Sequence, residues 1–215
     1  MKEIRSRLVL QHYMQEEFAW RKKELHNLKV LVVSNEKTHS RDLCIRAAVT
    51  LLYAHWEGFV KFIGSCYLEF VARQKLTHDQ LPSNFLAVCV SSLINDATES
   101  SKPQMRLDVV NFFRKDGATR SRIQWKSAIN TQANLNSAVF RDIVLTLGLD
   151  YSQFATKEKL LDEKLLANRN RIAHGQHLLV VYEEYVELHD ELIGIMQVFY
   201  NQIDNAAFTG AFRLT

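Results

Sequence analysis

The chain has 215 residues, 47% of them hydrophobic and 24% charged, the balance of a globular protein that can bury one substantial core. Its 27 basic and 24 acidic residues leave a formal net charge of +3, too small to predict extensive non-specific binding of nucleic acid. Only 7 glycines and 2 prolines occur, fewer than the turns of all-β or doubly wound architectures need. These numbers favour an all-helical fold, and the sequence holds no glycine-rich phosphate loop.

The first two predicted helices span most of residues 4–75. Apolar residues recur at helical spacing from about residue 4 to residue 33, and the polar segment 34–40 is a predicted connection in which Ser40 is a candidate N-cap. The second helix, from about 41 to 75, is apolar on nearly every side, so we expect it at the centre of a bundle. Three polar or charged residues, His55, Glu57 and Lys61, interrupt its apolar run, which therefore predicts a buried helix and no membrane span.

A third helix is predicted to begin at Pro82 and Ser83, but the helical periodicity weakens from 95 to 134. Basic residues with few acids are interleaved there with Phe112, Phe113 and Trp125. This segment could be a mobile, functional insertion or a solvated linker with short helices, and we slightly favour the linker.

Three more helices are predicted after this insertion. One covers about 136–147 and stops at Gly148, the next runs from about 156 to an end or kink at Gly175, and the last carries an amphipathic stripe over 181–203. We therefore predict one all-α domain over residues 1–215, a single helical bundle with an irregular insertion around 95–134.

The cysteines and the N-terminus indicate the compartment. Cys44, Cys66 and Cys89 form no C-x-x-C pair and lie in apolar runs, as buried free thiols of a reducing cytosol do. The first five residues lack the apolar core of a signal peptide. We expect a cytoplasmic protein with no membrane partner.

The sharpest pattern is the segment 165–175, LLANRNRIAHG, at a predicted helix end. At about 100° per residue, Asn170 and His174 share one helical face, and the long side chain of Arg169 can reach the same spot. Arginine is an always-charged donor suited to phosphate, histidine transfers protons near neutral pH, and the asparagine amide can orient either the imidazole or the phosphate. These groups suffice for cleaving RNA without a metal.

In such a reaction a base removes the proton of the ribose 2′-OH, the oxygen attacks the adjacent phosphorus, and the arginine stabilises the added charge. DNA lacks the 2′-OH, so the mechanism would select RNA. The spacing alone does not establish this chemistry. The other interpretation is an ordinary helix end with a solvent-facing Arg169 and a capping His174.

The segment resembles the R-x-x-x-x-H signature of HEPN domains (higher eukaryotes and prokaryotes nucleotide-binding), in the form where Asn follows the Arg. Four further stretches are similar to one prokaryotic stand-alone branch of that superfamily: LLYAHWEGFVK at 51–61, TQANLNS at 131–137, LGLD at 147–150 and LLDEKL at 160–165. The resemblance extends from about residue 41 to the C-terminus, and the N-terminal helix is less distinctive.

This resemblance implies a helical bundle whose members often dimerise, bringing two motifs into a shared cleft. Many catalytic relatives are metal-independent endoribonucleases of toxin–antitoxin, abortive-infection or other defence systems. On that basis Arg169 and His174 are the catalytic pair, Asn170 is their polar assistant and Arg171 is a candidate substrate-binding residue. No metal or other cofactor is expected. The implied partners are an RNA substrate, a second copy of the chain, and a cognate antitoxin or defence protein. One related subgroup carries a modified Tyr two residues after the His, where this chain has Gln176, so that regulation is not expected.

Glu57 is a possible supporting residue. A carboxylate on an apolar helix needs a partner, and Arg169 is the obvious one. The pair could orient the arginine at the site or form a structural ion pair, and both alternatives stay open. His55 and Trp56 are predicted to pack in the core, and His177 and His189 to be surface or cap residues.

Two other functions stay open at this stage. Some HEPN proteins bind nucleotides, RNA or a protein without cutting, and a purely structural helical adaptor would make the motif residues dispensable. The intact Arg-Asn and His pattern argues against such degeneration.

Overall fold

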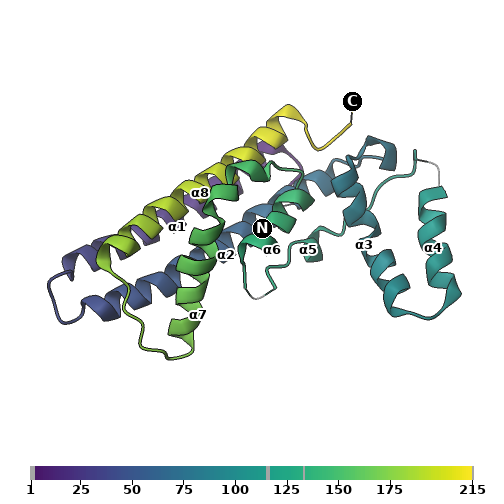
Figure 1. Cartoon of the computed structure of the whole chain (residues 1–215). Coiled ribbons are helices and arrows are strands. Elements are labelled where there is room, and N and C mark those ends of the chain that lie inside the picture. The colour runs from purple at the N-terminus through teal and green to yellow at the C-terminus, as the bar shows by residue number, and fades with distance from the viewer. Residues whose placement is uncertain (1–2, 115–116, 133, 215) are drawn as a thin grey trace.

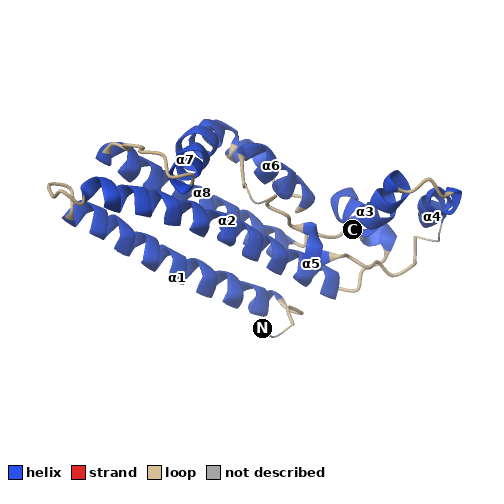
Figure 2. Ribbon diagram, turned by 90° about the horizontal axis from the view of Figure 1, so that it is seen from below, coloured by secondary structure: helices blue, strands red, loops and turns tan. Residues whose placement is uncertain are grey.

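The computed structural model describes residues 3–114, 117–132 and 134–214. Three long helices lie side by side and form the body of the molecule (Figure 1, Figure 2): α1 (Arg7–Ser34), α2 (Arg41–Arg73) and α8 (Tyr182–Thr209). Buried apolar side chains form one hydrophobic cluster that extends along the chain from Ile4 to Phe212. The predicted all-helical class is confirmed, and no β-strand occurs within the described ranges.

Helix α1 presents a single apolar stripe to the core. It begins where the Ser6 side chain accepts a hydrogen bond from the backbone N–H of Val9. Its buried residues recur mostly every three or four positions, at Leu10, Met14, Phe18, Arg21, Leu25 and Val32.

Helix α2 lies at the centre of the bundle, as its apolar pattern predicts, and contacts α1, α8, α7 (Ala167–Ala173) and the short helix α5 (Trp125–Ala128). Ser40 occupies the N-cap position, but its side chain caps no backbone N–H because its own φ and ψ of −87° and −4° are already helical. The helix boundary is therefore confirmed and the cap is wrong. None of the helices in the described chain combines the length and apolarity needed to cross a membrane.

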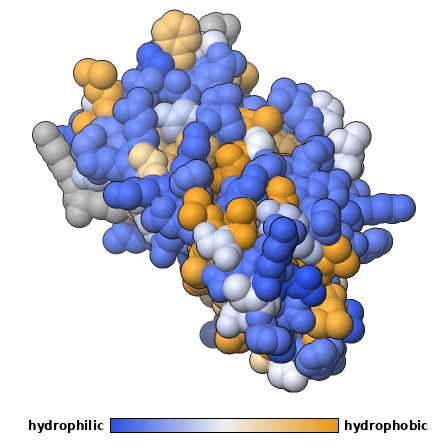
Figure 3. All heavy atoms as spheres, turned by 90° about the vertical axis from the view of Figure 1, so that its left-hand side faces the viewer, coloured by the Kyte–Doolittle hydropathy of each residue, from blue (hydrophilic) through white to orange (hydrophobic). Residues whose placement is uncertain are grey.

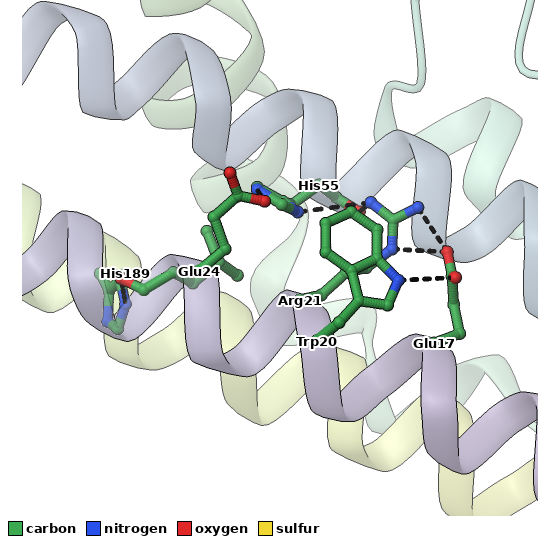
Figure 4. Close-up of polar contacts among 7 residues, drawn as sticks. Glu17, Trp20, Arg21, Glu24, His55 and His189 are labelled. Atoms are coloured by element: carbon green, nitrogen blue, oxygen red, sulfur yellow. Dashed lines mark hydrogen bonds and ion pairs between the residues drawn. The ribbon is translucent and has the colours of Figure 1, made fainter.

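A buried polar cluster joins α1 to α2 (Figure 4). The guanidinium of Arg21 lies 2.5 Å (Nη2) from Oε1 of Glu17, and its Nη1 donates to the backbone oxygen of His55 at 3.1 Å. The imidazole Nε2 of His55 lies 3.2 Å from Oε2 of Glu24. Burial lowers the pKa of His55, against the opposing effect of the Glu24 charge. His55 is thus a packing residue of the α1–α2 interface, as predicted.

The other histidines divide between core and surface. His189 on α8 is buried, with its Nε2 3.1 Å from the carbonyl oxygen of Leu25, so its predicted surface or cap position is wrong. His177 is exposed, as expected. Trp56 is fully buried in the core.

The predicted insertion contains more helix than its weak periodicity indicates. After the short turn η1 (His78–Gln80), α3 (Ser83–Glu99) begins at the predicted residue, and α4 (Pro103–Arg114) packs against it. Helix α4 buries none of its side chains, although its own sequence is amphipathic. Figure 1 shows α3 and α4 beyond the three long helices, away from the end that carries α7.

The chain returns to the bundle through α6 (Ser137–Thr146), whose first turn is capped by the Asn136 side chain, which accepts a hydrogen bond from the backbone N–H of Val139 at 2.8 Å. Gly148 follows with a left-handed φ of 69°, which confirms the predicted stop. The 3₁₀ turns η2 (Tyr151–Gln153) and η3 (Ala155–Lys157) then lead to the segment that carries the motif.

Candidate functional site

The motif lies on two consecutive helical segments. The first, η4 (Leu160–Leu166), is a π-helix in which the N–H of Ala167 bonds to the carbonyl oxygen of Asp162, five residues earlier. The second, α7 (Ala167–Ala173), continues directly from it and packs against α2. The helix predicted from about residue 156 to Gly175 is therefore confirmed in its extent, but its middle part is π-helical. Because a π-turn rotates the residues that follow it, η4 sets the direction in which the motif faces, and such turns are frequent at functional sites.

The carboxylate of Asp162 fixes the π-helical segment to the start of α6. It accepts hydrogen bonds from the backbone N–H of Ser137 at 2.7 Å and from the hydroxyl of the same residue at 2.5 Å. A negative charge at a helix N-terminus is also favoured by the helix dipole. Asp162 thereby gives the π-helix a tertiary anchor that helical spacing cannot reveal.

Arg169 is held by three uncharged partners. Its guanidinium carbon lies 4.2 Å from the centroid of the Tyr53 ring on α2, a cation–π contact. Its Nη1 donates to Oδ1 of Asn134 at 3.2 Å and to Oδ1 of Asn170 at 2.6 Å. No ion pair joins Arg169 to a carboxylate of the described residues. The side chain is therefore oriented while its positive charge stays available to an anion.

Asn170 contacts the guanidinium of Arg169. From its sequence position we expected it to orient the imidazole of His174 or a bound phosphate. The side-chain amide oxygen of Asn170 accepts a hydrogen bond from Arg169. Its backbone oxygen accepts a hydrogen bond from the N–H of His174 at 3.0 Å. Its Nδ2 donates to none of the described groups, so the amide nitrogen is available to a ligand.

His174 occupies the C-cap position of α7 and its side chain is exposed. The helix end is closed by backbone: Gly175 has a left-handed φ of 74°, and the N–H of Gln176 bonds to the carbonyl oxygen of Arg171 at 3.0 Å. The imidazole itself makes no hydrogen bond to a described residue. These contacts do not support the interpretation in which the His174 ring is merely the cap.

The turn after His174 is tied to α2, because Nη2 of Arg46 donates to the backbone oxygen of Gln176 at 3.1 Å. Arg171, the predicted substrate-binding residue, is exposed, and its Nε donates to Oε1 of Gln176 at 3.2 Å. Two residues along a helix correspond to about 200° around its axis. The structure therefore does not gather Arg171 with Arg169.

The predicted pairing of Glu57 with Arg169 is wrong. Glu57 Oε1 accepts a hydrogen bond from the hydroxyl of Thr131 at 2.6 Å, and no ion pair joins it to Arg169 in the described chain. The physical reason is that the Tyr53 ring, one turn earlier on α2, takes the position next to the guanidinium. Glu57 instead holds Thr131, three residues before the Asn134 that contacts Arg169.

Tyr53 and Asn134 are site residues that spacing arguments missed. The hydroxyl of Tyr53 accepts a hydrogen bond from the buried backbone N–H of Leu135 at 2.6 Å, so one side chain holds both the arginine and the loop. Burial raises the pKa of Tyr53, which keeps the hydroxyl neutral at physiological pH. Tyr53 lies in the stretch 51–61 and Asn134 in the stretch 131–137, both of which carry the family resemblance. That resemblance is the sequence signal that could have pointed to them.

The site thus combines an arginine that forms no ion pair with any described residue and an exposed imidazole at one helix end. Within the described ranges, no three His, Cys, Asp or Glu side chains are grouped as metal ligands would be. A helical bundle that presents this R-x-x-x-x-H arrangement has the form of a HEPN-type protein.

The family model RiboL-PSP-HEPN matches residues 16–205, so the chain belongs to this HEPN family. Membership indicates a nucleotide- or RNA-related function. The match begins within α1 and therefore includes most of the N-terminal helix, where the resemblance is less distinctive. No curated protein and no solved structure matches the chain.

Proposed function

We propose that the protein is a metal-independent endoribonuclease in which Arg169 and His174 act on one phosphodiester. The observation that carries this proposal is the environment of Arg169: three neutral groups orient the guanidinium, and no carboxylate of the described residues forms an ion pair with it. By contrast, Arg21, which joins α1 to α2, is paired with Glu17. The setting in a toxin–antitoxin or defence system rests on the family resemblance, and the cytoplasm is where such an enzyme meets its RNA.

The reaction uses groups that are present in the chain. The neutral imidazole of His174 removes the proton of a ribose 2′-OH, a bond forms between O2′ and phosphorus, and the bond from phosphorus to O5′ breaks. The products are a 2′,3′-cyclic phosphate and a 5′-OH, whose oxygen takes a proton from the protonated imidazole or from water. Arg169 stabilises the charge on the non-bridging oxygens, and the free amide nitrogen of Asn170 can donate to the same phosphate.

We further propose that the protein acts as a homodimer with the site near its interface. The solvent face of α2 carries an apolar stripe at helical spacing, Leu43, Ala47, Leu51 and Ala54, and Leu43 and Leu51 are 70% and 41% exposed. In Figure 3, which views the left-hand side of Figure 1, apolar patches interrupt a mostly hydrophilic surface. Arg46, on a neighbouring face of α2, bonds to the turn after His174, so a second copy seated on the stripe would lie beside that turn.

The dimer is tested by the mass of the protein in solution. Light scattering should give twice the chain mass for the wild-type protein and the chain mass for Leu43→Glu with Leu51→Glu. A wild-type monomer at cleavage-competent concentration would overturn the dimer while leaving the site assignment intact.

The chemistry is tested by the ends of the product. Purified protein in EDTA should cut RNA to leave a 2′,3′-cyclic phosphate and a 5′-OH, and a substrate with 2′-deoxyribose at the cleaved position should stay intact. A 5′-phosphate product, or cleavage that requires a divalent cation, would contradict the mechanism. RNA binding without cleavage would instead assign the chain to the non-catalytic HEPN modules.

A further inference from the structure

A pocket separate from the R-x-x-x-x-H motif lies at the C-terminal end of α2. It has a volume of about 790 Å³ and is formed by the end of α2, by α3 and α4, and by the chain between them and α5. This size is in the range of sites that hold a small-molecule ligand, about 300–1,000 Å³. We name it the basic pocket and define it by six of its lining residues: His78, Phe112, Arg120, Arg122, Trp125 and Lys126.

The wall that carries the arginines is ordered by backbone hydrogen bonds. The N–H of His78 donates to the oxygen of Thr119 at 3.0 Å, and the N–H of Ser121 donates to the oxygen of Leu76 at 2.9 Å. The chain here is extended, so its side chains alternate between two faces. Ser121 and Ile123 are accordingly buried, whereas the arginines at 120 and 122 are exposed on one side.

Most of the charge of the basic pocket has no acidic partner among the described residues. Its lining includes four cationic residues, Arg73, Arg120, Arg122 and Lys126, and no Asp or Glu. Arg73, at its edge, is paired with Glu3 at 3.0 Å. By contrast, Arg120, Arg122 and Lys126 form no ion pair with any described residue. Because the whole chain carries only +3, this is a local concentration of positive charge that suits an anionic ligand.

Two aromatic rings lie among these cations. Phe112 packs on the ring of His78, with 4.9 Å between the centroids, and Trp125 is half-buried with Nζ of Lys126 5.6 Å from its ring. Cations that follow a sugar-phosphate backbone together with rings on which bases stack are the combination found in sites for single-stranded nucleic acid. An acidic peptide would match the charge and leave the rings without a base to stack on.

We propose that the basic pocket binds a nucleotide of a single-stranded RNA, with the phosphate on Arg120, Arg122 and Lys126 and the base against Trp125 or Phe112. It is distinct from the motif: Tyr53 and Arg73 are twenty residues apart on α2, which corresponds to about 30 Å. The pocket would hold RNA whether or not the motif cuts it, so this proposal does not depend on the proposed reaction.

The test is a binding measurement on the full-length chain carrying His174→Ala, so that the probe stays intact. The probe is a fluorescein-labelled oligoadenylate of about eight nucleotides, within the ~4–16 nucleotides that single-strand sites cover. Arg120→Gln with Arg122→Gln should weaken binding about tenfold and reduce the slope of log affinity against log salt by about 1.4, since each phosphate contact to a single strand contributes about 0.7. The matched control, Lys22→Gln with Lys23→Gln, removes two exposed charges from α1 and should leave the slope unchanged.

A second variant tests stacking independently of charge. Trp125→Leu should weaken binding of the oligoadenylate about tenfold and leave the slope of log affinity against log salt unchanged. An equal loss of oligoadenylate affinity in the α1 control and in the Arg120→Gln, Arg122→Gln variant would overturn the proposal. Displacement of the probe by polyglutamate of equal charge would also overturn it. Displacement by micromolar AMP would also overturn it, because the pocket would then be a site for free nucleotides.

Discussion

The guanidinium carbon of Arg169 lies 4.2 Å from the centre of the Tyr53 ring, so the arginine of the motif rests on an aromatic residue of the central helix. The hydroxyl of the same tyrosine accepts a hydrogen bond from the backbone N–H of Leu135. This bond anchors Leu135, next to the Asn134 that contacts the arginine. One side chain of α2 thus positions two segments that are far apart in the sequence.

This arrangement separates two roles of Tyr53 by mutation. Tyr53→Phe keeps the ring under Arg169 but leaves the buried N–H of Leu135 without an acceptor, so it should cost about 1–3 kcal/mol of unfolding free energy in urea titrations. RNA cleavage per folded molecule should be nearly unchanged. Tyr53→Leu also removes the ring, and kcat/KM should fall about tenfold, the equivalent of about 1.4 kcal/mol. Equal kcat/KM for the two variants would show that the ring does not position the arginine.

Glu57 tests whether a direct carboxylate–arginine contact matters. Because Glu57 bonds to Thr131 and not to Arg169, Glu57→Gln can still accept that hydrogen bond. We expect kcat/KM to change less than about threefold, well under about 1 kcal/mol. A loss as large as that of Arg169→Ala would mean that the carboxylate charge itself acts at the site.

Glycines on two helices form a matched pair for stability. A Cβ at Gly58 would lie 2.8 Å from Nη2 of Arg21, whose guanidinium is held by Glu17 and by the backbone of His55. Gly58→Ala should therefore destabilise the protein by about 1–2 kcal/mol. A Cβ at Gly194 on α8 meets nothing within 4 Å, so Gly194→Ala should stabilise it by about 0.5–1 kcal/mol. Thermal and urea unfolding measure both changes, and stabilisation by Gly58→Ala would contradict the packing of Arg21.

The pH dependence of stability should report the buried His55. Burial lowers its pKa below the ordinary 6.5, and its neighbours are Arg21, Glu17 and Glu24. Between the folded and unfolded pKa values the unfolded chain binds more protons, so stability rises with pH there. The contribution of His55 is fully present above about pH 6.5 and is lost as the pH falls through the folded pKa.

Urea titrations from pH 8 to pH 5 should accordingly show a steeper acid loss of unfolding free energy for the wild-type protein than for His55→Gln. Identical slopes would mean that this histidine is as easily protonated in the folded state as in the unfolded chain.

The helical bundle and most of its boundaries could be predicted from sequence because they depend on local signals. Apolar periodicity and the left-handed glycines Gly148 and Gly175 located helices and their ends. The π-helical segment was not predicted, and the contact that anchors it, between Asp162 and Ser137, is tertiary and leaves no local signal in the sequence. Helix α4 is amphipathic and could have been recognised from its sequence, although it buries no side chain.

For the site, helical phase predicted the neighbourhood of Arg169, Asn170 and His174 but not what each side chain contacts. Glu57 was assigned to Arg169 by charge alone, and the neutral Tyr53 occupies that place instead. Partner choice across helices depends on three-dimensional packing, which neither spacing nor charge pattern contains.

The most direct test of the account compares RNA cleavage in EDTA by the wild-type protein, Arg169→Ala and His174→Ala, with Arg171→Ala as the matched control from the same helix. We expect Arg169→Ala and His174→Ala to lose cleavage while circular dichroism shows an intact helical fold. Arg171→Ala should cut RNA at close to the wild-type rate. Undiminished cleavage by Arg169→Ala and His174→Ala would contradict the assignment of this site.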